Sequence, residues 1–258
     1  MTPLLAVGAV LAVPGLAWAT SGGGGSGGAG TGPGGSGSGQ SQPNPNVPVS
    51  AGNVPVSASA DGITITSEAS AFLRGGVSVT GSVPRSDAGD TVEIDQLSSS
   101  SAWVPVADAT AQPGGSFSAG WHPSRPGQLT IQAVVSGGQA SSATAAPTVS
   151  VTVYKRSIAT LYGPGFYGHR TACGKILRRR TIGVANRTLP CGTPVEIYYK
   201  GRVITVPVID RGPYAHGANW DLTMATGRAI GMLGTEVIGA AAVSSASSTP
   251  ASGAPAGQ

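Results

Sequence analysis

Short segments in which apolar and polar residues alternate dominate residues 58–154 of the chain. This period of two is typical of β-strands with one buried face, and the Gly, Pro and Asp residues between the segments mark turns. The spacing predicts a β-sandwich. Trp103 and Trp121 lie within it, either as core residues or as exposed platforms on which sugar rings stack. The segments are Gly62–Thr66, Gly76–Thr80, Thr91–Ile94, Gln128–Gln132 and Thr148–Val153.

Residues 155–243 carry a second set of β patterns, and we expect them to form a separate, mostly β domain. Its clearest feature is a hairpin whose two strands turn at Lys200-Gly201. One helix is predicted, with Thr223 as its N-cap, residues 224–230 as its body and Gly231 as its stop. The expected strands are Ile158–Tyr162, Thr181–Ala185, Val195–Tyr199 and Arg202–Ile209.

The two ends of the chain have compositions that do not predict a packed core. Residues 1–20 are an apolar run ending Ala17-Trp18-Ala19, which is typical of a secretory signal; because no basic residues precede the run, an uncleaved anchor is the alternative. Residues 21–57 are rich in Gly, Ser and Pro and predict a disordered linker, and residues 244–258 predict a disordered tail. After signal cleavage we expect no membrane span, because no later apolar stretch approaches the ~20 residues required.

Charge divides the chain at the same boundary. Residues 155–243 contain 12 Lys and Arg against 4 Asp and Glu, a net charge of +8, whereas the remainder has 3 against 7, a net charge of −4. A basic domain indicates an anionic partner, and in an exported protein this is an envelope polymer or a membrane surface rather than nucleic acid. The run Arg178-Arg179-Arg180 fits such a surface, and it fits an ordinary solvated loop equally well.

The chain contains two cysteines, Cys173 and Cys191. In an exported protein this number favours a disulfide, which would stabilise the fold by roughly 3 kcal/mol, and two buried thiols are the alternative. The three histidines show no spacing with the cysteines that would complete a zinc site, so we expect no metal. Residues 155–243 contain no phosphate loop and no Gly-x-Ser-x-Gly elbow, and no cofactor is implied.

One carboxyl group is placed at the end of a predicted strand. Ile204, Val206 and Val208 share one face of the second hairpin strand, and Asp210 is the next residue on that face. The side chain of Asp210 should therefore lie at a rim, partly in water and partly against apolar side chains. A carboxyl group in such a position is a candidate general acid.

Several motifs occur in the order found in RlpA-like double-psi β-barrels, and residues 155–243, about a third of the chain, resemble this family. Asp210-Arg-Gly-Pro213 followed by Asp221-Leu222 is specific in combination. The resemblance implies an all-β protein with a six-stranded double-psi β-barrel, preceded by an immunoglobulin-like sandwich as in secreted actinobacterial members; expansins are more distant relatives. The other motifs are Tyr162-Gly-Pro-Gly165, Arg170-Thr-Ala-Cys-Gly174, Arg187-Thr-Leu-Pro190 and Gly192-Thr193.

The resemblance implies a peptidoglycan lytic transglycosylase whose catalytic acid is Asp210. One carboxyl group can protonate the departing glycosidic oxygen and then, as a base, help the C6 hydroxyl of muramic acid to close a 1,6-anhydro ring. Asp221 is a second catalytic candidate, because the matching aspartate of expansin-like barrels lies in the groove. Alternatively, Asp221 holds backbone amides at the start of the helix.

The chain departs from the family pattern at three positions. Asn186 stands where active RlpA proteins typically have a histidine, and an amide cannot titrate. Lys175 and Arg178 replace two positions that are usually acidic. His216, in the loop after Asp210-Arg-Gly-Pro213, could replace the lost imidazole or simply face solvent.

Three functions from different classes therefore remain: a glycan-cleaving enzyme; a non-catalytic, expansin-like binder that holds a glycan by stacking and charge; and a structural or adhesive surface protein in which the barrel is a stable module. The first two imply a secreted, extracellular or wall-associated monomer that binds peptidoglycan glycan strands or another anionic wall polysaccharide. The residues expected to contact the glycan are Tyr162, Arg170, Asn186, Arg211, Tyr214, His216 and Trp220.

Overall fold

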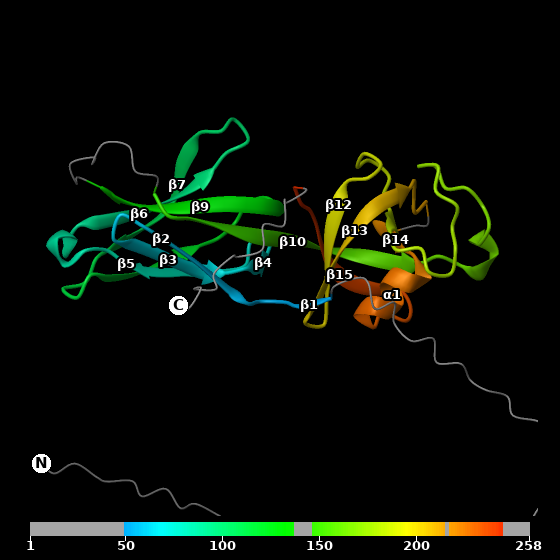
Figure 1. Ribbon diagram of the computed structural model, residues 1–258, viewed down its shortest axis with the longest axis horizontal. Helices are drawn as coiled ribbons and strands as arrows, with labels where there is room; N and C mark the ends of the chain where they lie inside the picture. The colour runs from blue at the N-terminus through cyan, green and yellow to red at the C-terminus, as the bar shows by residue number, and fades with distance from the viewer. Residues whose placement is uncertain (1–48, 137–145, 215–216, 245–258) are drawn as a thin grey trace, which may run out of the picture. The chain divides into compact units, whose positions relative to one another are not determined.

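A sandwich and a barrel share one long strand in this protein (Figure 1). The computed structural model describes residues 49–136, 146–214 and 217–244. Strand β10, Thr148–Leu161, pairs with the sandwich strand β9 through residues 148–153 and with the barrel strand β15 through residues 155–159. The sequence predicts two separate strands here. The structure joins them because the intervening residues 155–157 also pair with a neighbouring strand.

The sandwich consists of two sheets that enclose one apolar core. Its first sheet has the order β2-β3-β5-β8, and its second has the order β7-β6-β9-β10 with the short strand β4 beside β10. Fully buried side chains from both sheets, such as Ile65 and Ile131, belong to one core cluster. The strands are β2 Pro55–Ala60, β3 Ile63–Glu68, β4 Ser70–Phe72, β5 Val77–Ser82, β6 Thr91–Leu97, β7 Trp103–Thr110, β8 Ser116–Trp121 and β9 Gly127–Ser136.

The β-sandwich prediction is confirmed, and the immunoglobulin-like assignment stays a prediction. The two tryptophans divide between the alternatives that the sequence left open. Trp121 is buried in the core, whereas Trp103 is exposed on the edge strand β7. A short 3-10 helix, Arg85–Asp87, connects β5 to β6.

The linker predicted to be disordered over residues 21–57 was given a C-terminal boundary that is too late. Residues 50–57 were expected to be disordered, but β1, Ser50–Ala51, pairs with the barrel strand β13, and β2 begins at Pro55 and pairs with β3. These residues are ordered because their backbone groups pair with neighbouring strands, and the amino-acid composition alone gives no information on such pairing. Residues 1–48, which include the predicted signal and most of the linker, lie outside the described residues, as do residues 245–258 of the predicted tail.

The barrel is closed and six-stranded, as the family resemblance implies. Its strands follow the order β14-β11-β13-β12-β15-β10, and β10 pairs back to β14. The pairs β10–β14 and β11–β13 are parallel and the other four are antiparallel. The strands beyond β10 are β11 Val184–Ala185, β12 Pro194–Tyr199, β13 Arg202–Asp210, β14 Trp220–Leu222 and β15 Glu236–Ala242.

The predicted hairpin and helix are both confirmed. Strands β12 and β13 turn at Lys200-Gly201, where both residues have positive φ. Helix α1, Met224–Ile230, begins after Thr223, whose side chain accepts from the Thr226 amide, and ends at Gly231 with φ of 77°. A 3-10 helix, Pro164–Phe166, follows β10. Among the described residues, no helix has the length and apolar character needed to span a membrane.

Strand β11 is shorter than the predicted Thr181–Ala185 because residues of helix α1 and its N-cap form hydrogen bonds with the backbone of Gly183. The buried Thr226 hydroxyl accepts from the Gly183 amide and donates to the Gly183 carbonyl, both at 3.0 Å. The Thr223 amide also donates to the Gly183 carbonyl. These bonds replace strand pairing at residue 183 and hold α1 directly beside the two residues of β11.

Replacing Thr226 with valine should therefore destabilise the protein. Valine has nearly the same shape, but it leaves the buried Gly183 amide without a partner, which costs about 1–3 kcal/mol. Urea denaturation of the Thr226→Val variant measures this loss. Thr205→Val, at an exposed position on β13, is the matched control and should change the free energy of unfolding by less than about 0.5 kcal/mol. Equal stability of the two variants would contradict the assigned role of Thr226.

Candidate active site

Three neighbouring strands place two carboxyl groups in one row. Ala185 on β11 pairs with Asp210 on β13 and, on its other side, with Asp221 on β14. Because adjacent strands lie roughly 5 Å apart, the Cα atoms of the two aspartates are about 10 Å apart. The pairing register shifts between Val184 and Ala185. An irregularity of this kind can redirect a side chain at the end of a strand.

The register shift modifies the predicted position of Asp210. Ile204, Val206 and Val208 are buried in the barrel core as expected. Ile209 is buried as well, in a small separate cluster that includes Tyr162 and Leu177. Strict alternation therefore ends at Val208, and Asp210 lies beside this second cluster and is half-buried.

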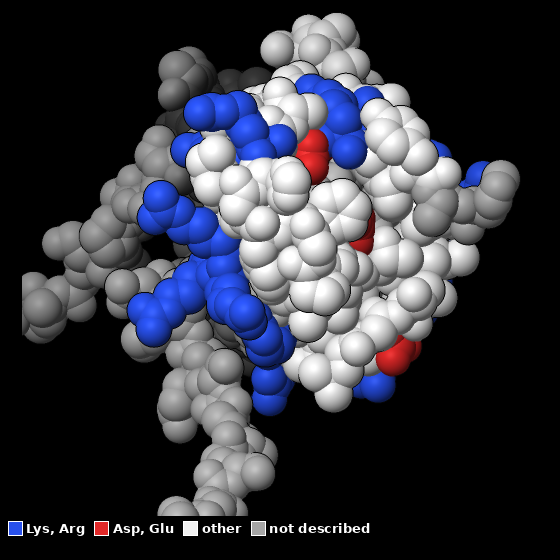
Figure 2. Space-filling model, turned by 90° about the vertical axis from the view of Figure 1, so that its right-hand side faces the viewer, with Lys and Arg blue, Asp and Glu red and all other residues white. Residues whose placement is uncertain are grey.

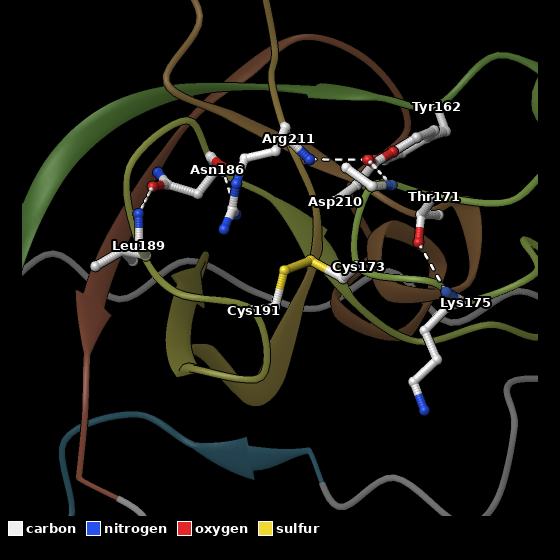
Figure 3. Close-up of a disulfide and its surroundings, with 10 residues drawn as sticks. Tyr162, Thr171, Cys173, Lys175, Asn186, Leu189, Cys191, Asp210 and Arg211 are labelled. Carbon is white, nitrogen blue, oxygen red and sulfur yellow. Dashed lines mark hydrogen bonds between the residues drawn. A yellow bond between two sulfur atoms is a disulfide. The ribbon is translucent and has the colours of Figure 1, made fainter.

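Three donors hold the carboxylate of Asp210 (Figure 3). The Tyr162 hydroxyl donates to Oδ2 at 2.8 Å, the Ala172 amide donates to Oδ1 at 2.7 Å, and the Arg211 amide donates to Oδ1 at 2.8 Å. Backbone amides can only donate, whereas a hydroxyl can donate or accept. A proton on Asp210 is therefore accommodated at Oδ2, with the Tyr162 hydroxyl turned to accept from it.

Tyr162 is not placed to stack on a glycan, contrary to the expectation from the sequence. Its side chain is only 5% exposed, and its ring packs edge-on against Phe166 with ring centroids 5.8 Å apart. Burial, followed by the hydrogen bond to Asp210 and the charges of Asp210 and Asp221, raises the pKa of Tyr162 above its usual range. The tyrosine therefore remains a neutral hydroxyl that positions the carboxyl group of Asp210.

Asp221 does not cap helix α1. Thr223 provides the cap, and the Oδ1 atom of Asp221 instead accepts a 2.8 Å hydrogen bond from the Thr160 hydroxyl on β10. Burial raises the pKa of Asp221 and the charge of Asp210 raises it further, while the hydrogen bond from Thr160 opposes the shift. The alternative role at the helix start is therefore not observed, and Asp221 is a second carboxyl group near Asp210.

Asn186 shapes the loop beside the acid. Its side-chain oxygen accepts from the backbone amides of Thr188 and Leu189, at 3.0 and 2.9 Å. The backbone amide of Asn186 donates to the backbone carbonyl of Asp210 at 3.2 Å. The Arg211 guanidinium donates to the Asn186 carbonyl at 3.4 Å. The side-chain oxygen of Asn186 is thus engaged within its own loop, and a glycan contact by Asn186 or Arg211 stays a prediction.

Of the remaining predicted contact residues, the structure describes Trp220, Tyr214 and Arg170. Trp220 is 8% exposed in the barrel core and lines a pocket of about 350 Å³ together with Asn186 and Leu189. Tyr214 is 78% exposed, and the Arg170 guanidinium donates to the Gly174 carbonyl. His216 lies outside the described residues.

Phe166 is an exposed aromatic residue that sequence reasoning missed. It follows the Gly163-Pro-Gly165 turn, and its side chain is 57% exposed while its ring contacts Tyr162. The signal available in the sequence was its place directly after a turn, because connecting segments run over the protein surface. Its position beside Tyr162 makes it a candidate for contact with a sugar ring.

Basic side chains lie along one side and at the top of this end of the barrel (Figure 2). Acidic residues appear in this view as small patches. All three residues of the arginine run are exposed, as in a solvated loop. The Arg179 guanidinium lies 5.4 Å from the Tyr167 ring centroid, and Arg228 on α1 donates to the Arg179 carbonyl at 3.4 Å.

The predicted disulfide between Cys173 and Cys191 is confirmed, with Cα atoms 5.7 Å apart. It joins the loop that follows β10 to the loop between β11 and β12 (Figure 3). Cys173 directly follows Ala172, whose amide contacts Asp210. The disulfide therefore lies one residue from the site.

Comparison with known proteins supports the resemblance for the barrel. Residues 154–244 match the profile of a family described as "Lytic transglycolase". Over 80 residues the chain is 42% identical to a Synechocystis protein, and over 87 residues it is 39% identical to an Aquifex aeolicus protein; both are named "Probable endolytic peptidoglycan transglycosylase RlpA". A Campylobacter jejuni protein named "Endolytic peptidoglycan transglycosylase RlpA" is 35% identical over 78 residues. Residues 154–244 are thus an RlpA-like double-psi β-barrel.

These similarities cover only part of the chain. The three matches cover 30%, 33% and 30% of this chain, and 25%, 38% and 28% of the respective relatives. The chain therefore spans well under half the length of the relatives it matches, and the sandwich lies outside the matched family region.

The raised pKa of Asp221 predicts a pH-dependent stability difference for the Asp221→Asn variant. The folded protein holds this proton more tightly than an unfolded chain does. The stabilisation from Asp221 is therefore full below the pKa of an aspartate in an unfolded chain, about 3.9, and is lost as pH rises through the raised value. Asparagine keeps the acceptor for Thr160 without the charge. The variant should gain stability over the wild type as pH rises through this window.

Urea denaturation at a series of pH values from 3.5 to 8 measures this difference. Thr205→Val, at an exposed position on β13, is the control, and its offset from the wild type should stay nearly constant because neither side chain titrates. A loss of stability at neutral pH in Asp221→Asn would show that the folded protein favours the ionised carboxyl group, contrary to this prediction.

Proposed function

We propose that the barrel cleaves peptidoglycan glycan strands as a lytic transglycosylase, with Asp210 as general acid and base. The observation that carries the proposal is the geometry of Asp210, a half-buried carboxyl group whose Oδ2 atom faces one reversible partner, the Tyr162 hydroxyl. Residues 154–244, which contain Asp210, match the family described as "Lytic transglycolase", and relatives whose names state a transglycosylase activity are similar to part of the chain. The whole protein would act at the cell wall after export.

In the proposed reaction Asp210 acts twice. First, the proton on Oδ2 moves to the glycosidic oxygen as the bond from that oxygen to C1 of muramic acid breaks. Next, the resulting carboxylate takes the proton from the C6 hydroxyl of the same sugar, and that oxygen bonds to C1 to give a 1,6-anhydro ring. No water is consumed, and Asp210 ends protonated as it began. The Tyr162 hydroxyl accepts from protonated Asp210 and donates to the carboxylate.

Asp221 is proposed to support this cycle as a second carboxyl group. Its raised pKa keeps it uncharged to a higher pH than an ordinary aspartate, which limits like-charge repulsion when Asp210 becomes a carboxylate. Hydrolytic glycosidases use a pair of carboxyl groups to activate water, whereas ring closure by the substrate's own hydroxyl requires only one. Asp210 therefore carries the proton transfers in this proposal.

The surroundings suit an anionic glycan. Muramic acid carries a carboxylate, and Lys175 and the arginine run supply positive charge near the turn that contacts Asp210. Tyr214 and Phe166 present exposed rings on which sugar faces can stack. We assign substrate contact to these two aromatic residues, with Arg170 and Arg211 as secondary candidates.

A non-catalytic glycan binder is the second candidate function, and Asn186 is the observation that favours it. An amide occupies the position where the family typically has a titratable histidine, and the side-chain oxygen of Asn186 is engaged by two backbone amides of its own loop. Binding by exposed aromatic rings and basic side chains would not need a titratable group.

Incubation of the full chain with peptide-free glycan strands tests the enzymatic proposal. Mass spectrometry should detect 1,6-anhydro ends with the wild type, and Asp210→Asn should form them on the order of 10²-fold to 10⁴-fold more slowly, because the variant cannot transfer the proton. Asp108→Asn serves as a control for a lost distant charge. Product formed at equal rates by Asp210→Asn and the wild type would refute the role of Asp210.

Retention on purified sacculi distinguishes the binder. If charge dominates binding, raising the salt concentration should release the protein, and a charge-neutralising variant of the arginine run, Arg178→Gln with Arg180→Gln, should elute at lower salt than the wild type. The matched control is Arg85→Gln, in the sandwich. Salt-independent retention of all three proteins would show that stacking, not charge, provides the affinity.

A further inference from the structure

We propose that the Cys173–Cys191 disulfide is a positioning device for Asp210, and that reducing it lowers the activity of the site. The disulfide holds in place the turn from which the Ala172 amide donates to Oδ1 of Asp210. This inference rests on the proposed function for its activity readout, and a separate readout in the absence of substrate tests it independently.

The two amide donors to Oδ1 differ in origin. The Arg211 amide belongs to the residue after Asp210, so their contact is local. The Ala172 amide comes from a position 38 residues away, so its contact depends on where the intervening chain is held. The Ala172 amide is therefore the donor that a structural change away from Asp210 can remove.

The turn that carries Ala172 is closed mainly on itself. The Gly174 amide donates to the Thr171 carbonyl at 2.9 Å, the Thr171 amide donates to the Lys175 carbonyl at 2.7 Å, and the Lys175 amide donates to the Thr171 hydroxyl at 3.1 Å. These bonds shape the turn without fixing it to the barrel. Within the described residues, the Ala172–Asp210 bond is the hydrogen bond that joins residues 171–175 to strand β13.

The other half of the disulfide is anchored next to the acid. The Gly192 amide donates to the Val208 carbonyl at 2.8 Å, and the Val208 amide donates to the Thr193 carbonyl at 2.9 Å. Cys191 thereby connects to β13 two residues before Asp210. The disulfide and the Ala172–Asp210 hydrogen bond complete a small ring that runs through Cys173, Cys191, Gly192 and Val208 back to Asp210.

A reductant can reach this link. Cys191 is exposed and Cys173 is half-buried. A dithiol such as dithiothreitol supplies two electrons and two protons, the S–S bond breaks to give two thiols, and the dithiol becomes a cyclic disulfide. The hydrogen bond from Ala172 and the packing of the neighbouring Leu177 in one cluster with Ile209 then hold the turn to β13. We expect Asp210 to lose its remote donor for part of the time.

Ala172→Pro gives a variant that keeps the disulfide, removes the donor and displaces the Asp210 carboxyl group, because the proline ring takes the place of the amide hydrogen beside Oδ1. Ala172 is the first central residue of the turn Thr171–Gly174, a position that proline favours, and proline has no amide hydrogen. The double variant Cys173→Ser with Cys191→Ser removes the link and keeps the donor. Both are compared with the oxidised and the reduced wild type as full chains.

We expect kcat for 1,6-anhydro product to fall on the order of tenfold in the double variant and in the reduced wild type, as for the loss of one hydrogen bond to a charged group. In Ala172→Pro, whose ring also displaces the carboxyl group, kcat should fall by at least about tenfold. KM should change less than about twofold, because the acid rather than glycan binding is disturbed. The double variant should not respond further to dithiothreitol. Full kcat in Ala172→Pro would overturn the positioning role of that amide.

Amide hydrogen exchange without substrate provides the independent readout. In the double variant and the reduced wild type, the Ala172 amide should exchange at least about tenfold faster than in the oxidised wild type, while the Arg211 amide should change little. Unchanged protection of Ala172 after reduction would overturn the proposal whatever the activity. If the oxidised wild type forms no product, the transglycosylase proposal fails while the exchange data still decide whether the disulfide positions Asp210.

Discussion

The pairing of the two-residue strand β11 with β13 on one side and β14 on the other is the constraint on which the site depends. Ala185 brings Asp210 and Asp221 into one row by pairing with both of them. Helix α1 limits the length of this strand, because the Thr226 hydroxyl forms hydrogen bonds with both the amide and the carbonyl of Gly183. A helix cap, a short strand and two carboxyl groups thus form one connected arrangement.

Around this row, each polar group of the acid has a specific partner. The Oδ1 atom of Asp210 faces two groups that can only donate, and Oδ2 faces a hydroxyl that can donate or accept. Asp221 has a single hydroxyl partner from Thr160, and its partial burial raises its pKa. The two aspartates therefore differ in their hydrogen-bond partners, and this difference supports giving the proton transfers to Asp210.

Much of the barrel could be predicted because its signals are local. The hairpin turn at Lys200-Gly201 requires positive φ, the Thr223 cap precedes its helix, and alternation identifies Ile204, Val206 and Val208 as core residues. The motif around Asp210 and Asp221 indicated the family, which the comparisons support over residues 154–244. The disulfide could be predicted because the chain has two cysteines and an exported protein enters an oxidising compartment.

The roles of individual side chains depended on contacts between distant residues. Alternation could not show that Tyr162 is buried against a residue 48 positions away, that the Ala172 amide reaches Asp210, or that residues 155–157 join two expected strands into β10. By itself the sequence determined the β architecture, the basic character of the barrel and the identity of the candidate acid, because these follow from periodicity, composition and motif. Only the tertiary structure decided which groups hold that acid, because hydrogen-bond partners are set by strand register and loop closure across the fold.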